Sequence, residues 1–145
     1  MAYTAKLLAR SVVTVTPSST VYEAARLMKA NKIGCVVVVD GKMIAGIFTE
    51  RDLLNRVVAE DWNPRETQVS KVMTTQVVSL DCAEPLEKVF EFLSRQRFRH
   101  LPVTEKGSLL GIISLTDLAG ILREAFLEPK YLQYFVSSLE NGRKS

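Results

Sequence analysis

The sequence predicts a mixed α/β (α+β) fold made of two tandem β-α-β-β-α repeats that form one pseudo-twofold intramolecular pair. The first observation is a repeated stretch: residues 46–52, Gly-Ile-Phe-Thr-Glu-Arg-Asp, return at residues 111–117 as Gly-Ile-Ile-Ser-Leu-Thr-Asp, a shift of 65 residues. The second is that the same shift aligns the other apolar segments without a gap, which indicates one supersecondary unit built twice. Neither copy has enough strand to close a core alone, so we expect the two sheets to pack on each other.

Residues 3–10 read as a short helical or irregular lead-in to the first repeat. Residues 12–15 alternate well enough for a strand, and Ser19 or Thr20 can cap a helix over residues 21–30, where apolar residues recur at helical spacing.

The middle of the first repeat reads as a hairpin followed by a helix. Residues 33–39 are β-branched and continuous enough for a strand that is buried on both faces. Asp40-Gly41 is a strong hairpin signal before a strand over residues 43–48. Thr49 then begins a second helix, and its expected apolar stripe consists of Leu53, Leu54, Val57 and Val58.

The polar segment at residues 60–67 separates the repeats, and a new unit begins at residues 69–74. The shift of 65 residues then predicts a strand over 76–80, a helix over 84–96, strands over 100–103 and 109–113, and a helix from Ser114. We therefore divide the chain into repeat 1 (residues 1–63), repeat 2 (64–127) and a C-terminal tail (128–145).

The tail begins a further segment at Pro129. Leu132, Phe135, Val136 and Leu139 fall at helical spacing, which predicts a short amphipathic helix. Such a helix can pack on its own chain or a twin subunit, or it can fit a groove on another protein.

Length and composition describe an ordinary globular chain. Its 145 residues are 47% hydrophobic and 24% charged, which fits one domain or two small lobes that share a core. The net charge of +3 is far from the basic stripe of a dedicated nucleic-acid binder. Lys6 and Arg10 interrupt the start before any signal peptide or membrane span could form, so we expect a cytoplasmic location without a membrane.

The cysteines and the single histidine do not predict catalysis or a metal site. Cys35 and Cys82 form neither a metal motif nor a disulfide framework, and we interpret them as reduced core thiols, with a redox pair as the alternative. His100 has no adjacent Cys, Ser or Asp motif, which makes it a poor general base or metal ligand. We predict no catalytic residue, no metal ligand and no enzyme activity.

The repeated motif places a hydroxyl and a carboxylate at a strand-to-helix junction. Thr49 or Ser114 suits the N-cap of the helix, and backbone N–H groups at such a terminus attract anions. Asp52 or Asp117 lies in the same turn, so the junction can hold a phosphorylated sugar through phosphate donors and a carboxylate for two ribose hydroxyls. The alternative is a capping box without a ligand, but two copies in register favour a binding function.

Tandem units that end in Gly-apolar-x-Thr/Ser-x-x-Asp resemble the cystathionine-β-synthase-type (CBS) domain pair, also called a Bateman module. The resemblance extends to about Arg123 and includes Val-Ser-Lys-Val-Met-Thr at 69–74 and Arg-His-Leu-Pro-Val at 99–103. It implies a regulatory module with two clefts between the repeats, dimerisation, and an adenosine-containing ligand: AMP, ADP, ATP, NAD or S-adenosylmethionine. It implies no required cofactor.

The resemblance also implies which residues form each cleft. Cleft A would combine Ser11, Val13, Ile33, Gly34 and Cys35, on the base side, with Ser114, Thr116 and Asp117. Cleft B would combine Thr49, Arg51 and Asp52 with Gln76, Val78, Arg99, His100, Leu101 and Pro102. Arg97, Arg99 and His100 make cleft B the more suitable one for di- or triphosphates, unless they are a solvated basic helix end. Repeat 1 departs from the pattern where Val37 replaces the counterpart of Pro102.

We therefore expect a non-catalytic, adenine-nucleotide-binding module that acts through a partner protein or a change of oligomer. A nucleic-acid-binding CBS protein is the alternative, and its binding would depend steeply on salt. A small nucleotide-processing enzyme is a third class, which turnover of a bound nucleotide would reveal. The helix stripes predict a homodimer, with an interface that includes Leu53, Val57, Leu118 and Leu122.

Overall fold

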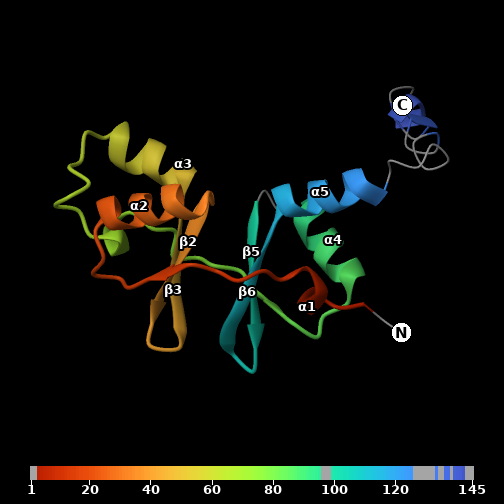
Figure 1. Cartoon of the computed structure of the whole chain (residues 1–145), viewed down its shortest axis with the longest axis horizontal. Coiled ribbons are helices and arrows are strands. Elements are labelled where there is room, and N and C mark those ends of the chain that lie inside the picture. The colour runs from red at the N-terminus through yellow and green to blue at the C-terminus, as the bar shows by residue number, and fades with distance from the viewer. Residues whose placement is uncertain (1–2, 96–98, 126–132, 134–135, 138, 143–145) are drawn as a thin grey trace. The chain divides into compact units, whose positions relative to one another are not determined.

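The computed structural model describes residues 3–95, 99–125, 133, 136–137 and 139–142. The chain divides into two compact units, Met1–Ile113 (unit 1) and Ser114–Ser145 (unit 2). Unit 1 contains two three-stranded sheets, with strand orders β1-β2-β3 and β4-β5-β6. Figure 1 shows β2 beside β3 and β5 beside β6. The prediction of a mixed fold built from tandem repeats is confirmed.

The elements of the first repeat and of the segment that follows it are α1 (Ala5–Leu8), β1 (Thr14–Val15), α2 (Val21–Asn31), β2 (Cys35–Asp40), β3 (Met43–Thr49), α3 (Glu50–Asp52), the π-helical turn η1 (Leu53–Val58) and the 3-10 turn η2 (Val69–Lys71). The second repeat has β4 (Leu80–Asp81), α4 (Leu86–Arg95), β5 (His100–Glu105), β6 (Ser108–Ser114) and, in unit 2, α5 (Leu115–Ala125).

Strand β2 is buried on both faces, as its β-branched sequence predicts. On one face Val36 and Val38 join a core with residues of α2, β3 and η1. On the other face Cys35 and Val37 pack in an apolar cluster that also contains Ile112 of β6. The two sheets therefore pack on each other within unit 1, as expected from their small size.

Local signals determine the start of α2 and the turn after β2. Thr20 caps α2 in a reciprocal capping box: Glu23 N donates to Thr20 Oγ1, and Thr20 N donates to Glu23 Oε2, both over 3.1 Å. Gly41, at a φ of 63°, allows the tight turn that pairs Asp40 with Met43.

Both first strands are shorter than predicted. The strand expected over residues 12–15 comprises only Thr14–Val15, and the one expected over 76–80 comprises only Leu80–Asp81. Each pairs in parallel with just two residues of its neighbour. The preceding Val12 and Val77 pack in the apolar cluster between the sheets instead of extending the ladder.

Only part of the apolar stripe expected along the helix from Thr49 is buried. Leu53 packs against the core and Val57 is fully buried, but Leu54 and Val58 are 60% and 63% exposed. Residues 53 and 57 lie on one face of the helix, and residues 54 and 58 lie on the adjacent face. Only the first pair faces the core. Val57 is therefore unsuitable as an interface residue.

The segments before the two repeats cross over. Ala5 N donates to Glu84 O over 2.8 Å, and Arg10 pairs with Ile112, so the lead-in bonds to the second repeat. The segment after the first repeat returns to it, because Thr74 pairs with Ile47 through two 2.9 Å hydrogen bonds.

In unit 2, α5 follows Ser114 as predicted, and Leu118 is buried. The described residues of the tail, 133, 136–137 and 139–142, are helical, with Val136 and Leu139 about half exposed. Leu132 and Phe135 lie outside the described residues, so the apolar face of the tail stays a prediction. No helix in the described part of the chain has the length and apolarity needed to cross a membrane.

Candidate functional site

Thr49 and Asp52 form a second reciprocal capping box where β3 meets α3. Thr49 N donates to Asp52 Oδ2 over 3.0 Å, and Asp52 N donates to Thr49 Oγ1 over 3.2 Å. The Thr49 hydroxyl also donates to Asp52 Oδ2 over 3.1 Å. Asp52 is only 7% exposed, so these bonds satisfy a carboxylate that has lost most of its water.

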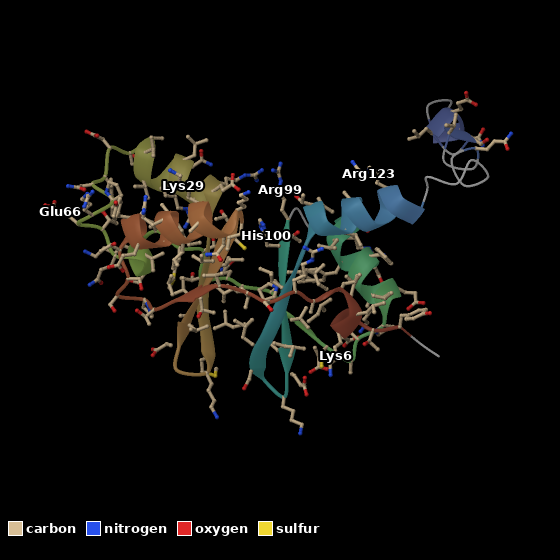
Figure 2. All side chains as sticks on the ribbon, viewed as in Figure 1. Lys6, Lys29, Glu66, Arg99, His100 and Arg123 are labelled. Carbon is tan, nitrogen blue, oxygen red and sulfur yellow. The ribbon has the colours of Figure 1, made fainter. Side chains whose placement is uncertain are left out.

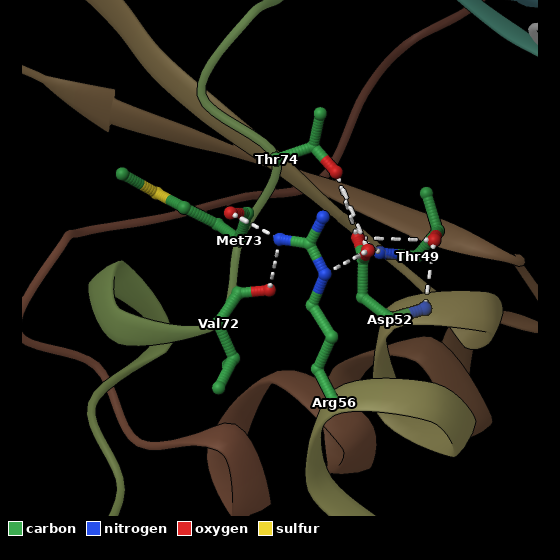
Figure 3. A network of polar contacts seen from close by, with 6 residues as sticks. All are labelled: Thr49, Asp52, Arg56, Val72, Met73 and Thr74. Carbon is green, nitrogen blue, oxygen red and sulfur yellow. Dashed lines mark hydrogen bonds and ion pairs between the residues drawn. The ribbon is translucent and has the colours of Figure 1, made fainter.

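Two further residues contact the same carboxylate (Figure 3). Thr74 Oγ1 donates to Asp52 at 3.3 Å and 3.4 Å from its two oxygens, and Arg56 Nε lies 3.6 Å from Oδ1. Arg56 Nη1 also donates to the carbonyl oxygens of Val72, over 3.3 Å, and Met73, over 3.1 Å. The motif carboxylate is thereby connected to the chain segment that leads into the second repeat.

The glycine of each motif allows another backbone to approach. A Cβ on Gly46 would lie 2.8 Å from Thr74 O, and a Cβ on Gly111 would collide with Arg10 O. Only glycine fits at these two crossings without a shift of backbone. The glycine of the repeated motif therefore serves the crossover, while the hydroxyl and the carboxylate lie at the helix start.

Glu50, Gly34 and His100 converge at the other side of this helix start. Glu50 N donates to Gly34 O over 3.0 Å, and a Cβ built on Gly34 would lie 3.5 Å from His100 Nε2. Burial, with a smaller contribution from the Glu50 charge, raises the pKa of the neighbouring Cys35 thiol to about 12. The thiol is therefore protonated at neutral pH.

The residues predicted for cleft B come from several elements of unit 1. Thr49 and Asp52 are in contact. His100 lies at the start of β5 (Figure 2), and its Nε2 would lie 3.5 Å from a Cβ on Gly34, a residue expected in cleft A. The exposed members are Arg51, Gln76, Val78 and Arg99, and the buried ones are Leu101 and Pro102. Arg97 lies outside the described residues.

The residues predicted for cleft A are divided between the two units. In unit 1, Ser11 is exposed, Val13, Ile33 and Gly34 are half-buried, and Cys35 is buried. In unit 2, Ser114 is half-buried, Thr116 is exposed, and Asp117 lies on α5 with its side chain outside the described part. Their meeting in one cleft stays a prediction.

Sequence reasoning missed Arg56 and Thr74 as partners of Asp52, and Glu50 as a neighbour of Gly34. The spacing of Asp52 and Arg56, four residues on a helix, is a signal for an ion pair that could have been used. Thr74 is 22 residues from Asp52, and nothing local in the sequence indicates that contact. Among the described residues, no three metal-ligating side chains come together.

Comparison with known proteins gives concordant matches. A family model described as CBS domain matches residues 5–59 and 69–124. The CBS domain-containing protein YhcV of Bacillus subtilis (strain 168) is 37% identical over 108 residues, which cover 74% of this chain and 76% of the relative. The chain spans only 21% of another match, CBSCBSPB2 of Arabidopsis thaliana.

Two solved structures extend the comparison. A protein of Burkholderia ambifaria MC40-6, provisionally described as a signal-transduction protein with CBS domains, has 38% identity and a TM-score of 0.72, covering 79% of this chain and 84% of its own. The hexameric CBS-CP12 protein from bloom-forming cyanobacteria has 30% identity and a TM-score of 0.73, covering 99% of this chain and 87% of its own.

Proposed function

Because the chain belongs to the CBS domain family, we propose that it is a non-catalytic regulatory module that binds an adenosine-containing nucleotide. The observation that carries the proposal is the Asp52 carboxylate, nearly buried and held in place by Thr49 at the start of a helix. A carboxylate in that setting can accept two hydrogen bonds from the diol of a ribose, and charge-assisted bonds of this kind are strong.

The surroundings of Asp52 supply what the rest of a nucleotide needs. Arg51 and Arg99 are exposed cations that can bind phosphates. The 99–102 segment supplies backbone groups and apolar side chains for a base. AMP, ADP, ATP, NAD and S-adenosylmethionine all present the same ribose diol and adenine base.

We propose regulation rather than catalysis because the buried cysteine near this site is a poor nucleophile. The thiolate is the reactive form of a cysteine, and the Cys35 thiol, with a pKa of about 12, is not ionised at neutral pH. The relative from Burkholderia ambifaria is described in terms of signal transduction. Nucleotide occupancy would act through a partner protein or through the oligomeric state, and the cyanobacterial relative is a hexamer.

The test is a calorimetric titration of AMP, ATP, NAD and S-adenosylmethionine into the wild type and the variants Asp52→Ala, Asp117→Ala and the double variant. Loss of a charge-assisted contact costs about 1.5–3 kcal/mol, so each single variant should weaken one site about tenfold or more. Nucleotide at about 100 times its dissociation constant should stabilise the wild type by about 2.7 kcal/mol, and the double variant should lose that effect.

Asp52→Asn is the matched control, because it retains a side-chain oxygen for the capping box while it loses the charge. It should lose less stability than Asp52→Ala, because the cap oxygen remains, and still bind nucleotide more weakly at one site. A double alanine variant that binds every one of these nucleotides as tightly as the wild type would contradict the ribose role of the two carboxylates.

A further inference from the structure

The acceptor positions of the Asp52 carboxylate are already occupied within the protein. A carboxylate has about four lone-pair positions for donors. Thr49 N, Thr49 Oγ1, Thr74 Oγ1 and Arg56 Nε all lie within 3.6 Å of its oxygens. The Thr49 bonds form the helix cap, so a ribose diol can gain acceptors only by displacing Thr74 and Arg56.

Arg56 connects the carboxylate to a distant segment. Its Nε faces Asp52 Oδ1, while its Nη1 donates to the carbonyl oxygens of Val72 and Met73. Its side chain is 52% exposed, compared with 9% for Asp52, so water can replace the contacts of the guanidinium more readily than those of the carboxylate. A ribose diol that reaches the carboxylate should therefore displace Arg56.

We propose that Arg56 and Thr74 form a latch on Asp52, and that a ribose diol opens this latch when a nucleotide binds there. The inference rests on the proposed function, since it concerns the same carboxylate. Opening releases the Arg56 guanidinium from the carbonyl oxygens of Val72 and Met73, and it releases the Thr74 hydroxyl from Asp52. Occupancy of this site therefore loosens residues 72–74. Those residues lead from the first repeat into the second.

The latch belongs to the first repeat alone. The shift of 65 residues places Ile121 where the first repeat has Arg56, and an isoleucine has no donor for a carboxylate or a carbonyl. Occupancy of a site at Asp117 therefore leaves Arg56 in place. Binding at Asp52 would release residues 72–74 and binding at Asp117 would not, although the two motifs are alike.

The binding test uses Asp117→Ala as the background, so that only the Asp52 site is measured. AMP is compared with 2′,3′-dideoxyadenosine monophosphate, which lacks the diol. Arg56→Met retains the aliphatic stem and removes the donors, so AMP should bind about tenfold more tightly while the dideoxy compound should bind as before. Thr74→Val, which replaces the hydroxyl with a methyl group, should also raise the affinity for AMP relative to that for the dideoxy compound.

Two controls separate the latch from simple charge effects. Lys71→Met removes an exposed cation from the same segment and should change the affinity for both nucleotides equally or not at all. Arg56→Lys retains the charge but cannot reach Asp52 and both carbonyls with one planar group, so it should give an intermediate ratio. If Arg56 serves to bind phosphate, Arg56→Met will weaken both nucleotides equally, and the latch is wrong.

Hydrogen exchange at the amides of residues 72–74 gives a second readout. AMP should speed exchange there in the Asp117→Ala protein, although bound ligands usually protect amides. Arg56→Met should show the faster exchange without nucleotide. Slower or unchanged exchange on addition of AMP would overturn the latch.

The two proposals fail in different ways. If the wild type binds no adenosine compound, the proposed function is wrong. If the wild type binds AMP and Asp52→Ala abolishes one site, but Arg56→Met and Thr74→Val leave the ratio of AMP to dideoxy affinity unchanged, then only the latch is wrong.

Discussion

Cys35 has the most strongly perturbed environment of the side chains considered above. It lies on β2, its side chain is buried, and the Glu50 carboxylate is close enough to oppose ionisation further. Both effects disfavour the thiolate, and together they raise the pKa from 9.0 to about 12. Disulfide exchange proceeds through the thiolate. The raised pKa of Cys35 therefore disfavours the alternative in which Cys35 and Cys82 form a redox pair.

The first prediction at this scale concerns reactivity. In native protein at neutral pH, Cys82, which is half-buried, should react with a thiol reagent faster than Cys35. The variants Cys35→Ala and Cys82→Ala assign the two phases of the reaction. Equal rates for the two cysteines would contradict the burial argument.

The raised pKa of Cys35 also makes the free energy of unfolding depend on pH. The folded protein retains a proton that the unfolded chain releases above pH 9.0, so the thiol's contribution to the free energy of unfolding is fully present below pH 9.0 and is lost as the pH rises toward about 12. Urea unfolding between about pH 8 and 11 should show a steeper loss in the wild type than in Cys35→Ala. Parallel curves would show that Cys35 is not the cause.

At the scale of elements, the crossings at Gly46 and Gly111 hold each motif strand against the segment before the other repeat. Gly46 lies beside Thr74 O and Met73 Sδ, and Ile47 pairs with Thr74. The segment that bears Thr74 must therefore lie directly on β3. This close approach also positions the Thr74 hydroxyl near Asp52.

The prediction for this crossing is that Gly46→Ala destabilises the fold by about 1–3 kcal/mol, because the new Cβ has no space beside backbone. Gly120→Ala is the matched control, since Gly120 lies within α5 and a Cβ there meets no atom within 4 Å. It should stabilise the helix by about 0.5–1 kcal/mol. Chemical denaturation measures both changes, and a neutral Gly46→Ala would show that the crossing can relax.

At the scale of the whole molecule, the exposed apolar residues Leu54 and Val58 lie side by side on η1. They replace Val57 and Leu118, which are buried within the chain, as the residues that can meet a second copy. Leu53 is half-buried against the core, and the side chain of Leu122 lies outside the described part. Two exposed apolar side chains one helical turn apart can contribute to an apolar contact with a second copy.

We therefore expect self-association that depends on Leu54 and Val58. The double variant Leu54→Asp, Val58→Asp should be a smaller species than the wild type in light scattering, with an unchanged circular dichroism spectrum. Met43→Asp is the control, because Met43 is at least as exposed as Leu54 and Val58 but lies at the hairpin. A wild type that is monomeric at about ten micromolar, an ordinary range for protein affinities, would contradict the expectation.

The sequence by itself determined the repeat and the local structure. The shift of 65 residues, the β-branched run of β2, the Asp40-Gly41 turn and the Thr20 cap are signals within a few residues of one another, and the structure confirms each. The Thr49 and Asp52 pair was also readable, because a capping box spans only three residues.

Only the tertiary structure decided which segments cross and what else contacts Asp52. Arg56 bonds to carbonyls 16 and 17 residues away, and Thr74 reaches Asp52 across 22 residues. The outward turn of Leu54 and Val58 likewise depends on how η1 packs on the core. Periodicity and propensity describe neighbours along the chain, whereas these contacts exist because the segment that follows the first repeat returns onto β3.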